Sequence, residues 1–276
     1  MPDIRETLRS AAARLEAAGV PEPVNDAALL LSHVIGEPPL SLRADAGRPL
    51  GAETLAAFEA LLARRESREP LQYILGEAYF MGLCLKAVPG VLIPRFDTEA
   101  LCQQAMDRMT GGEKVLDLCT GSGALAVALA HAFPKTQVVA GDISPMACDL
   151  ARENAARCGA RVEVRRGDLF APFAGASFDL ILSNPPYIPA GELPGLQEEV
   201  RREPALALDG GADGLDFYRR IIREAPGYLK PDGWLLLEIG SDQARAVTAL
   251  MRDYGEISVY SDLNGLDRVV AGRREK

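Results

Sequence analysis

The chain has 276 residues, 48% of them hydrophobic and 25% charged, which is typical of a globular protein with one large domain and a smaller one. The formal net charge of −9 argues against a broad nucleic-acid-binding surface, because such a surface needs clustered Lys and Arg. No apolar segment has the length of a membrane span, and residues 1–6 contain no signal core. We therefore expect a cytoplasmic protein that binds neither membranes nor, directly, nucleic acid.

Cysteine and histidine usage narrows the possible chemistry. The five cysteines form no CxxC pair, which favours reduced thiols in a cytosol. The two histidines, His33 and His131, lie far apart in the sequence. A zinc site or a His-based catalytic triad is therefore not expected, and we assign no metal.

The first 70 residues or so are predicted to form three short amphipathic helices. Apolar residues recur at helical spacing over residues 4–15, before Gly19 interrupts the pattern. A second helix follows Pro23 and ends near Gly36, and a third covers residues 55–62 before a charged stretch. Such a unit favours packing or recognition rather than catalysis.

A hairpin and then alternating strands and helices are predicted for the rest of the chain. Met81 and Gly82 separate two short apolar segments, as the turn of a β-hairpin does. The predicted strands cover residues 115–118, 137–140, 162–164, 178–182, 234–238, 257–259 and 268–271. The predicted helices begin near Asp97 and then cover residues 124–132, 145–158, 217–229 and 242–251. Such alternation with apolar strands predicts an α/β fold whose sheet is covered on both faces.

A glycine-rich loop follows the first strand of this region. Gly121 and Gly123 allow a sharp turn and a close approach to a ligand, and the next helix offers unpaired N–H groups there. The spacing also fits the dinucleotide fingerprint, so this loop alone leaves NAD and S-adenosylmethionine open. Asp142 ends the next strand and can accept from ribose hydroxyls, which both cofactors have. Ser144 is better placed than Asp142 to cap the helix that opens at Pro145.

Asp168 and Leu169 follow the third strand of the series. There a carboxylate can meet the exocyclic amine of an adenine, and an apolar side chain can cover its ring. A loop carboxylate without a role is the alternative.

Residues 184–187 read Asn-Pro-Pro-Tyr directly after a predicted apolar strand. Two consecutive prolines cannot continue a central strand, so the strand must end there. The side-chain carbonyl of Asn184 and the main-chain carbonyl of Pro185 are acceptors, and Tyr187 offers an aromatic face. This set suits gripping a planar NH2 group and presenting its nitrogen to an electrophile; a Pro-rich turn without function is the alternative. Hydride transfer has no use for such a turn, and no His or Lys lies beside it, so the motif favours methyl transfer from a sulfonium.

Over nearly its whole length the chain resembles the N5-glutamine methyltransferases that modify peptide-chain release factors, the PrmC/HemK family. The resemblance combines Asn-Pro-Pro-Tyr with several other segments. These are residues 69–76, 92–95, 97–99, 116–123, 183–188, 203–206, 210–211, 213–215 and 238–240. It implies a helical N-terminal domain for substrate docking (residues 1–75), a linking hairpin (76–90) and a seven-stranded, Rossmann-like class I methyltransferase domain (91–276).

The resemblance further implies S-adenosyl-L-methionine as the cofactor and the glutamine of a release-factor Gly-Gly-Gln motif as the substrate. The implied cofactor contacts are Cys119, Thr120, Gly121, Ser122, Gly123, Asp142, Asp168, Leu169 and Asn184. The implied substrate contacts are Asn184, Pro185, Pro186 and Tyr187, of which Asn184, Pro185 and Tyr187 are the expected catalytic residues. We expect the enzyme to act as a monomer.

The chain departs from the family pattern at two positions. The family usually has Gly where this chain has Cys119, and Pro where it has Phe96. If position 119 requires a positive φ, Cys resists that conformation. We expect the Cys119 thiol to be inert rather than redox-active.

Three other functions stay open at this point. The same site could methylate the glutamine of a ribosomal protein or of another protein. It could instead methylate an exocyclic base amine in DNA or RNA, which would require a basic groove and a flipped base. A non-catalytic adaptor with a methyltransferase fold is the third alternative.

Overall fold

The computed structural model describes residues 1–275, which form two compact units. One unit contains residues 1–76 together with residues 197–202, and the other contains the rest of the chain. The chain therefore passes from one unit to the other three times, after Gly76, after Leu196 and after Arg202. A six-residue segment of the second half of the sequence thus belongs to the N-terminal unit.

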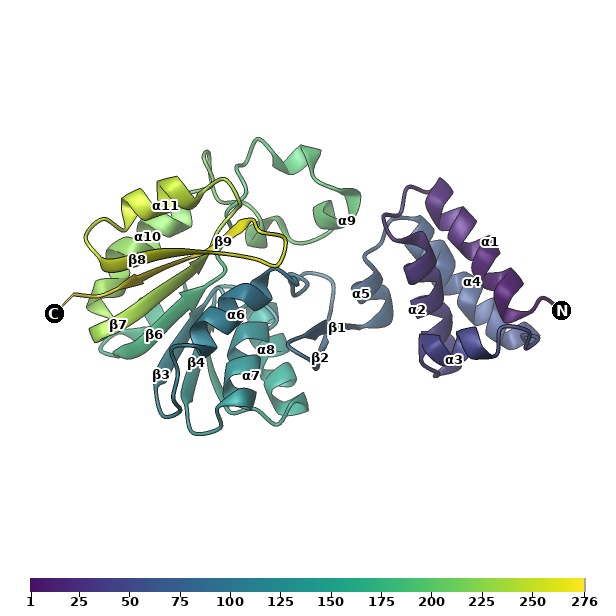
Figure 1. The fold of residues 1–276 in the computed structure, drawn as a ribbon, viewed down its shortest axis with the longest axis horizontal. Helices are drawn as coiled ribbons and strands as arrows, with labels where there is room; N and C mark the ends of the chain where they lie inside the picture. Colours follow the sequence, from purple (N-terminus) through teal and green to yellow (C-terminus); the bar gives the residue numbers. More distant parts are fainter. Residues whose placement is uncertain (276) are drawn as a thin grey trace. The chain divides into compact units, whose positions relative to one another are not determined.

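The N-terminal unit is helical (Figure 1). Its helices are α1 (Ile4–Ala17), α2 (Pro23–Ile35), α3 (Pro39–Ala44), α4 (Ala52–Glu66), α5 (Leu71–Leu75) and, from residues 197–202, α9 (Glu198–Arg201). The three predicted helices are α1, α2 and α4, whereas α3 and α5 were not predicted. Asp3 caps α1 by accepting from the Glu6 N–H at 2.8 Å, and Gly36 ends α2 in the left-handed region.

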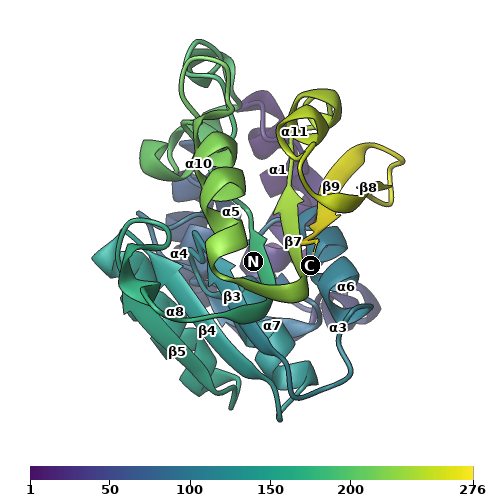
Figure 2. The same ribbon diagram turned by 90° about the vertical axis from the view of Figure 1, so that its left-hand side faces the viewer.

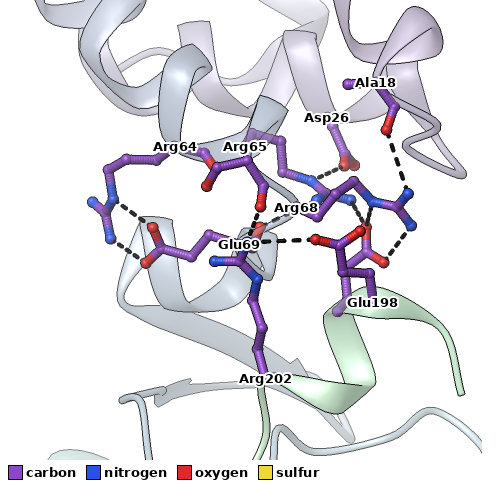
Figure 3. Close-up of polar contacts among 10 residues, drawn as sticks. Ala18, Asp26, Arg64, Arg65, Arg68, Glu69, Glu198 and Arg202 are labelled. Carbon is purple, nitrogen blue, oxygen red and sulfur yellow. Dashed lines mark hydrogen bonds and ion pairs between the residues drawn. The ribbon is translucent and has the colours of Figure 1, made fainter. Parts of the chain in front are cut away.

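A buried charge network holds α9 within this unit (Figure 3). The Arg65 guanidinium donates to Asp26 and to Glu199, each at 2.8 Å, and Arg68 donates to Glu199 at 2.6 and 2.7 Å. The side chains of Arg65 and Asp26 are only 4% and 7% exposed. Burial raises the pKa of Glu199, but the hydrogen bonds from Arg68 and Arg65 outweigh it and lower the pKa to about 2. Because Glu199 stays ionised, removing either arginine would leave a poorly solvated charge.

The second unit begins with the predicted hairpin, formed by β1 (Glu77–Phe80) and β2 (Leu83–Lys86). Met81 and Gly82 have φ values of 48° and 77°, as a two-residue turn between twisted strands requires. Phe80 and Leu85 are buried in the core of this unit, so the hairpin is packed onto it.

A seven-stranded sheet forms the centre of the second unit, as expected. Its strands are β3 (Lys114–Leu118), β4 (Gln137–Asp142), β5 (Val162–Arg166), β6 (Phe178–Ser183), β7 (Leu229–Glu238), β8 (Gly255–Ser261) and β9 (Asp267–Arg273). The order is β5-β4-β3-β6-β7-β9-β8, with β3 to β7 parallel and β9 antiparallel to both of its neighbours. In register, Leu118 at the end of β3 pairs with Gly141 on one side and Ser183 on the other. The segments that follow these strands therefore leave the sheet at the same edge.

Helices cover both faces of the sheet (Figure 2). Side chains of α6 (Thr98–Met106), α7 (Ala124–Ala132) and α8 (Pro145–Arg157) join one hydrophobic core, and those of α10 (Asp216–Glu224) and α11 (Ala244–Leu250) join the other. The bounds of α7 are those predicted.

The prediction of one helix over residues 217–229 was wrong at its C-terminal end. Helix α10 ends at Glu224, a 3-10 turn covers Ala225–Gly227, and Leu229 already begins β7. Pro226 explains the early end, because it has no N–H to donate within a continuing helix. Among the described residues, no helix has the length and apolar character needed to cross a membrane.

Candidate active site

A cavity opens at the carboxyl edge of the parallel strands, where ligands bind in sheets of this kind. It is lined by residues at or just after the ends of β3, β4, β5 and β6, and by residues 90–92. Pro204, Leu206 and Ala207 and side chains of α8 and α10 complete the lining. The predicted site residues that line it are Cys119, Gly121, Asp142, Asp168, Leu169, Asn184 and Pro186. The other predicted residues, Thr120, Ser122, Gly123, Pro185 and Tyr187, lie next to these in the chain but do not line the cavity.

The glycine loop is fixed by hydrogen bonds to the neighbouring strand. The Gly121 N–H donates to Oδ2 of Asp142 at 2.9 Å, which brings the loop after β3 against the end of β4. At Gly123, φ is +83° and an added Cβ would lie 2.9 Å from the Ala151 Cβ, so only glycine lets α7 begin this close to α8. The two glycines thus shape the loop for different reasons, one at the cavity and one at the helix contact.

Thr120 and Ser122 tie the glycine loop to buried side chains of the protein interior. Both are buried; the Thr120 hydroxyl donates to Asp117 at 2.5 Å, and the Ser122 carbonyl accepts from the Asn154 side chain at 2.9 Å. Burial raises the pKa of Asp117 to about 7, with the Thr120 hydroxyl acting in the opposite direction. These two residues therefore help to hold the shape of the loop.

Cys119 has a φ of +58°, so the position where the family usually has Gly does require the left-handed region. For a non-glycine residue this conformation costs about 1–2 kcal/mol. Burial raises the pKa of the Cys119 thiol to about 12, and the nearby Asp142 carboxylate acts in the same direction. The thiol is therefore protonated at neutral pH, which makes it a poor nucleophile. The second departure, Phe96, is 64% exposed.

Asp142 faces the cavity with a carboxylate that already accepts two backbone hydrogen bonds. Its Oδ2 accepts from Gly121 and its Oδ1 from Ser144, each at 2.9 Å. The Ser144 hydroxyl accepts from the Ala147 N–H at 3.3 Å, so Ser144 caps α8, as predicted. Burial raises the pKa of Asp142, while the two N–H groups oppose that shift. Each oxygen keeps a further lone pair with which to accept a ligand hydroxyl.

Asp168 forms an ion pair that the sequence did not indicate. Its Oδ2 lies 2.7 Å from Nη2 of Arg220, which comes from α10 and also lines the cavity. Leu169 beside it is buried. Arg220 is 52 residues away along the chain, so no local pattern could have revealed the pair.

The Asn-Pro-Pro-Tyr segment leaves β6 at Ser183, whose hydroxyl donates to the Leu118 carbonyl at 2.8 Å. Asn184 lines the cavity, and its Nδ2 donates to Oγ1 of Thr98 at 3.1 Å. Because Nδ2 is engaged in this way, Oδ1 is the end of the amide available to accept from a ligand.

Tyr187 is held from several sides. The Gln243 side chain donates to its carbonyl at 2.9 Å, and Gly210 and Gly214 approach its backbone so closely that an added Cβ would overlap it. Burial raises the pKa of the Tyr187 hydroxyl to about 12, and the Glu238 carboxylate acts in the same direction. The hydroxyl is therefore neutral at physiological pH and does not serve as a base.

Glu203 anchors another part of the cavity wall. It is buried, accepts from the Ile93 N–H at 2.9 Å and pairs with the Arg95 guanidinium. Burial raises the pKa of Glu203, with Arg95 opposing the shift. The pair joins residues 93–95 to the segment that begins with Pro204, and Phe96 does not prevent it.

The seven-stranded sheet, the glycine loop after β3 and the Asp142 carboxylate at the end of β4 together define a class I methyltransferase. Residues 6–76 match the family model of the PrmC N-terminal domain, and residues 95–196 match that of the methyltransferase small domain. A release factor glutamine methyltransferase of Geobacter sulfurreducens is 48% identical over 273 residues, covering 98% of this chain and 96% of that protein. One of Moorella thermoacetica is 44% identical over 281 residues and covers 99% of each. The chain belongs to the family of release factor glutamine methyltransferases.

A solved structure supports the fold. A 16S rRNA methyltransferase of T. Thermophilus in complex with AdoMet and guanosine has a TM-score of 0.52 and 18% identity, covering 72% of this chain and 50% of that chain. At this identity the likeness concerns the fold alone.

Proposed function

We propose that this chain transfers the methyl group of S-adenosyl-L-methionine to the side-chain amide nitrogen of the glutamine in the Gly-Gly-Gln motif of peptide-chain release factors. Family membership supports the reaction class, because relatives at 48% and 44% identity are named release factor glutamine methyltransferases. The observation that carries the proposal is the Asn184 amide, which lines the cavity with its nitrogen already bonded within the protein. Its oxygen is then the acceptor for a substrate NH2 group.

The cavity chemistry fits the proposed cofactor. Asp142 offers a carboxylate for the ribose hydroxyls, and Asp168 with Leu169 offers a carboxylate and an apolar surface for the adenine. When bound, S-adenosylmethionine supplies a methyl group on a positively charged sulfur, which is already a strong electrophile. The protein's part is to place the nitrogen and to stabilise the charge that develops on it.

The glutamine nitrogen is a poor nucleophile because its lone pair is delocalised into the carbonyl. We propose that Oδ1 of Asn184 and the carbonyl of Pro185 accept its two N–H hydrogens, which fixes the nitrogen toward the methyl group. Tyr187 would pack on the amide plane, and Pro186 would shape the cavity wall. As positive charge develops on the nitrogen, two aimed acceptors stabilise the transition state more than the neutral amide. The proton that becomes acidic can leave to water, so no strong base is required.

The test is methyl transfer from labelled S-adenosylmethionine to a purified release factor, compared with the same factor carrying another residue in place of the glutamine. Label on the intact factor alone is the expected result. Asn184→Ala should slow turnover by about 10²–10³-fold, the usual effect of losing one aimed group, with cofactor affinity nearly unchanged by titration calorimetry. Normal turnover in Asn184→Ala would refute the role of this site, and label on a ribosomal protein or on nucleic acid instead would refute the substrate.

We further propose that the enzyme works in the cytoplasm as a monomer. The cysteines of the described chain are all unpaired, which suits a compartment that keeps thiols reduced. Light scattering of the purified protein would test the monomer directly.

A further inference from the structure

Thr98 touches the active site from an element remote in sequence. It is the first residue of α6, it is 5% exposed, and its Oγ1 accepts from Nδ2 of Asn184, 86 residues further along the chain. Thr98 itself does not line the cavity. Its hydrogen bond to Asn184 is the direct link between Thr98 and the cavity.

A buried carboxyl group lies behind Thr98. Glu238, at the end of β7, is 1% exposed, and the nearby Thr98 side chain opposes the rise in its pKa that burial causes. Its Oε2 has no hydrogen-bond partner among the residues that the structure describes. A threonine hydroxyl has one proton and two lone pairs, whereas a carboxylate can only accept. While Thr98 accepts from Nδ2 of Asn184 with one lone pair, its proton is free to turn toward the Glu238 carboxylate.

This direction of hydrogen bonding matters because the two ends of an asparagine amide are nearly equal in size. Packing alone does not decide which end faces the cavity. A reversed amide would point its NH2 group at the NH2 group of the substrate, and neither group could accept from the other.

We infer that Thr98 is a positioning residue that, with Glu238 behind it, fixes the Asn184 amide with its oxygen toward the substrate nitrogen. This inference rests on the proposed function, because it gives Asn184 the acceptor role assigned above.

The main test compares Thr98→Val, which keeps the shape and removes the hydroxyl, with Thr98→Ser, which keeps the hydroxyl. Misplacing an aimed group can cost on the order of 100-fold, so Thr98→Val should lower kcat about 10–100-fold at saturating release factor and cofactor. The Kd of S-adenosylmethionine and the KM of the release factor should change less than about threefold, and Thr98→Ser should recover most of kcat. A normal kcat in Thr98→Val, or an equal loss in Thr98→Ser, would overturn the inference.

A double-mutant cycle separates this inference from the proposed function. If Thr98 acts through Asn184, adding Thr98→Val to Asn184→Ala should cause no further loss of kcat. Independent losses that multiply in the double variant would show that Thr98 acts in another way. Normal turnover in Asn184→Ala alone would instead refute the proposed function. A strong effect of Asn184→Ala with none of Thr98→Val would refute only the positioning role.

The pH profile gives a readout that a purely structural role would not change. Burial raises the pKa of Glu238 to about 7; Thr98, Arg268 from β9 and Arg95 oppose the shift, and Asp97 adds to it. Tyr187 also faces this carboxyl, but its own raised pKa keeps it neutral. Once protonated, Glu238 can donate to Thr98, and the hydroxyl can then turn its proton toward Asn184 and favour the reversed amide.

We therefore expect kcat of the unmodified enzyme, measured at saturating cofactor, to fall as the pH falls through about 7. Glu238→Gln and Thr98→Val should lack this step and show a low, flat profile. An unchanged step in Glu238→Gln would contradict the part assigned to Glu238.

Discussion

Asp142 is held in place before any ligand arrives, because its two oxygens accept from the backbone N–H groups of Gly121 and Ser144. These bonds fix the direction of the carboxylate without using all of its lone pairs. A carboxylate that is both oriented and partly buried would lose little conformational freedom on binding the ribose hydroxyls that we propose for it. The sequence predicted the residue, and the structure shows what orients it.

Asp142→Ala is expected to weaken S-adenosylmethionine binding by about 1.5–3 kcal/mol, the usual contribution of hydrogen bonds to a charged group. Titration calorimetry measures this directly. Asp149→Ala is a matched control, because Asp149 is an exposed carboxylate on α8 that pairs with Arg152 and does not line the cavity. NAD should not bind to the unmodified protein. A rise in Tm with NAD and none with S-adenosylmethionine would favour a dehydrogenase instead.

Cys119 is a non-glycine residue in the left-handed backbone region, a conformation that costs free energy. Its left-handed backbone would suit Gly, yet the turn keeps its path because Thr120 donates from its N–H to the Gly141 carbonyl at 3.0 Å. The loop is thus determined by its neighbours in the sheet more than by the residue at position 119.

At the scale of elements, the loop that follows the Asn-Pro-Pro-Tyr segment folds back and encloses it. Ile188 donates to the Leu208 carbonyl at 3.0 Å and accepts from the Gly210 N–H at 2.8 Å. Gln243, just before α11, reaches the Tyr187 carbonyl, and the Tyr218 hydroxyl of α10 donates to the Glu238 carbonyl at 2.8 Å. Parts of the chain that are distant in sequence therefore hold the motif rigidly at the end of β6.

Gly214→Ala is expected to displace Tyr187. Gly214 has a φ of +73°, and an added Cβ would overlap the Tyr187 carbonyl oxygen. The left-handed backbone alone should lower the free energy of unfolding by about 1–2 kcal/mol, and kcat should fall while cofactor affinity is kept. Denaturant unfolding and single-turnover rates measure both effects.

Gly191→Ala is the control for this substitution. Gly191 lies in the same loop, has no positive φ, and an added Cβ would meet no atom within 4 Å. Its effect on stability should stay within about 0.5 kcal/mol. Similar losses in the two variants would show that the close approach to Tyr187 is not what matters.

At the scale of the whole molecule, residues 197–202 belong to the N-terminal unit although the residues on both sides of them belong to the methyltransferase unit. The carboxylate of Glu199 lies between the guanidinium groups of Arg65 and Arg68. In the sequence, this segment lies between the Asn-Pro-Pro-Tyr segment and the cavity-lining residues Pro204, Leu206 and Ala207.

Deleting residues 1–68 is expected to spare S-adenosylmethionine binding and to raise the KM for an intact release factor. A Gly-Gly-Gln tip offers little surface for specificity, so contacts remote from the reacting nitrogen must provide it. The loss of kcat/KM should be much smaller for a short peptide that carries the same tip. Steady-state kinetics with both substrates test this.

Full-length Glu199→Gln is the control for the deletion, which also leaves Glu199 without its arginine partners. The variant weakens the charge network but keeps the remaining surface of the N-terminal unit. If docking matters, Glu199→Gln should affect protein and peptide alike, and only the deletion should discriminate between them. Equal losses for both substrates in the deleted protein would rule out docking.

Local sequence patterns were enough to predict most of the helices and strands. Periodicity, glycines and prolines gave α7 its observed bounds and placed all seven strands of the sheet, because these signals act over a few residues. They did not reveal the short α3 and α5, which are too short to show a clear helical period. The predicted end of α10 was wrong because Pro226 prevents the helix from continuing.

By itself the sequence determined the reaction class, since the glycine loop, Asp142 and the Asn-Pro-Pro-Tyr segment each follow a strand and the carboxyl ends of parallel strands meet at one edge. Only the tertiary structure decided what orients these groups. Thr98 reaches Asn184 across 86 residues, Gln243 reaches Tyr187 across 56, and Arg65 holds Glu199 across 134. Such pairs leave no local periodicity, because a hydrogen bond needs the two atoms to meet in space and sets no requirement on their separation along the chain.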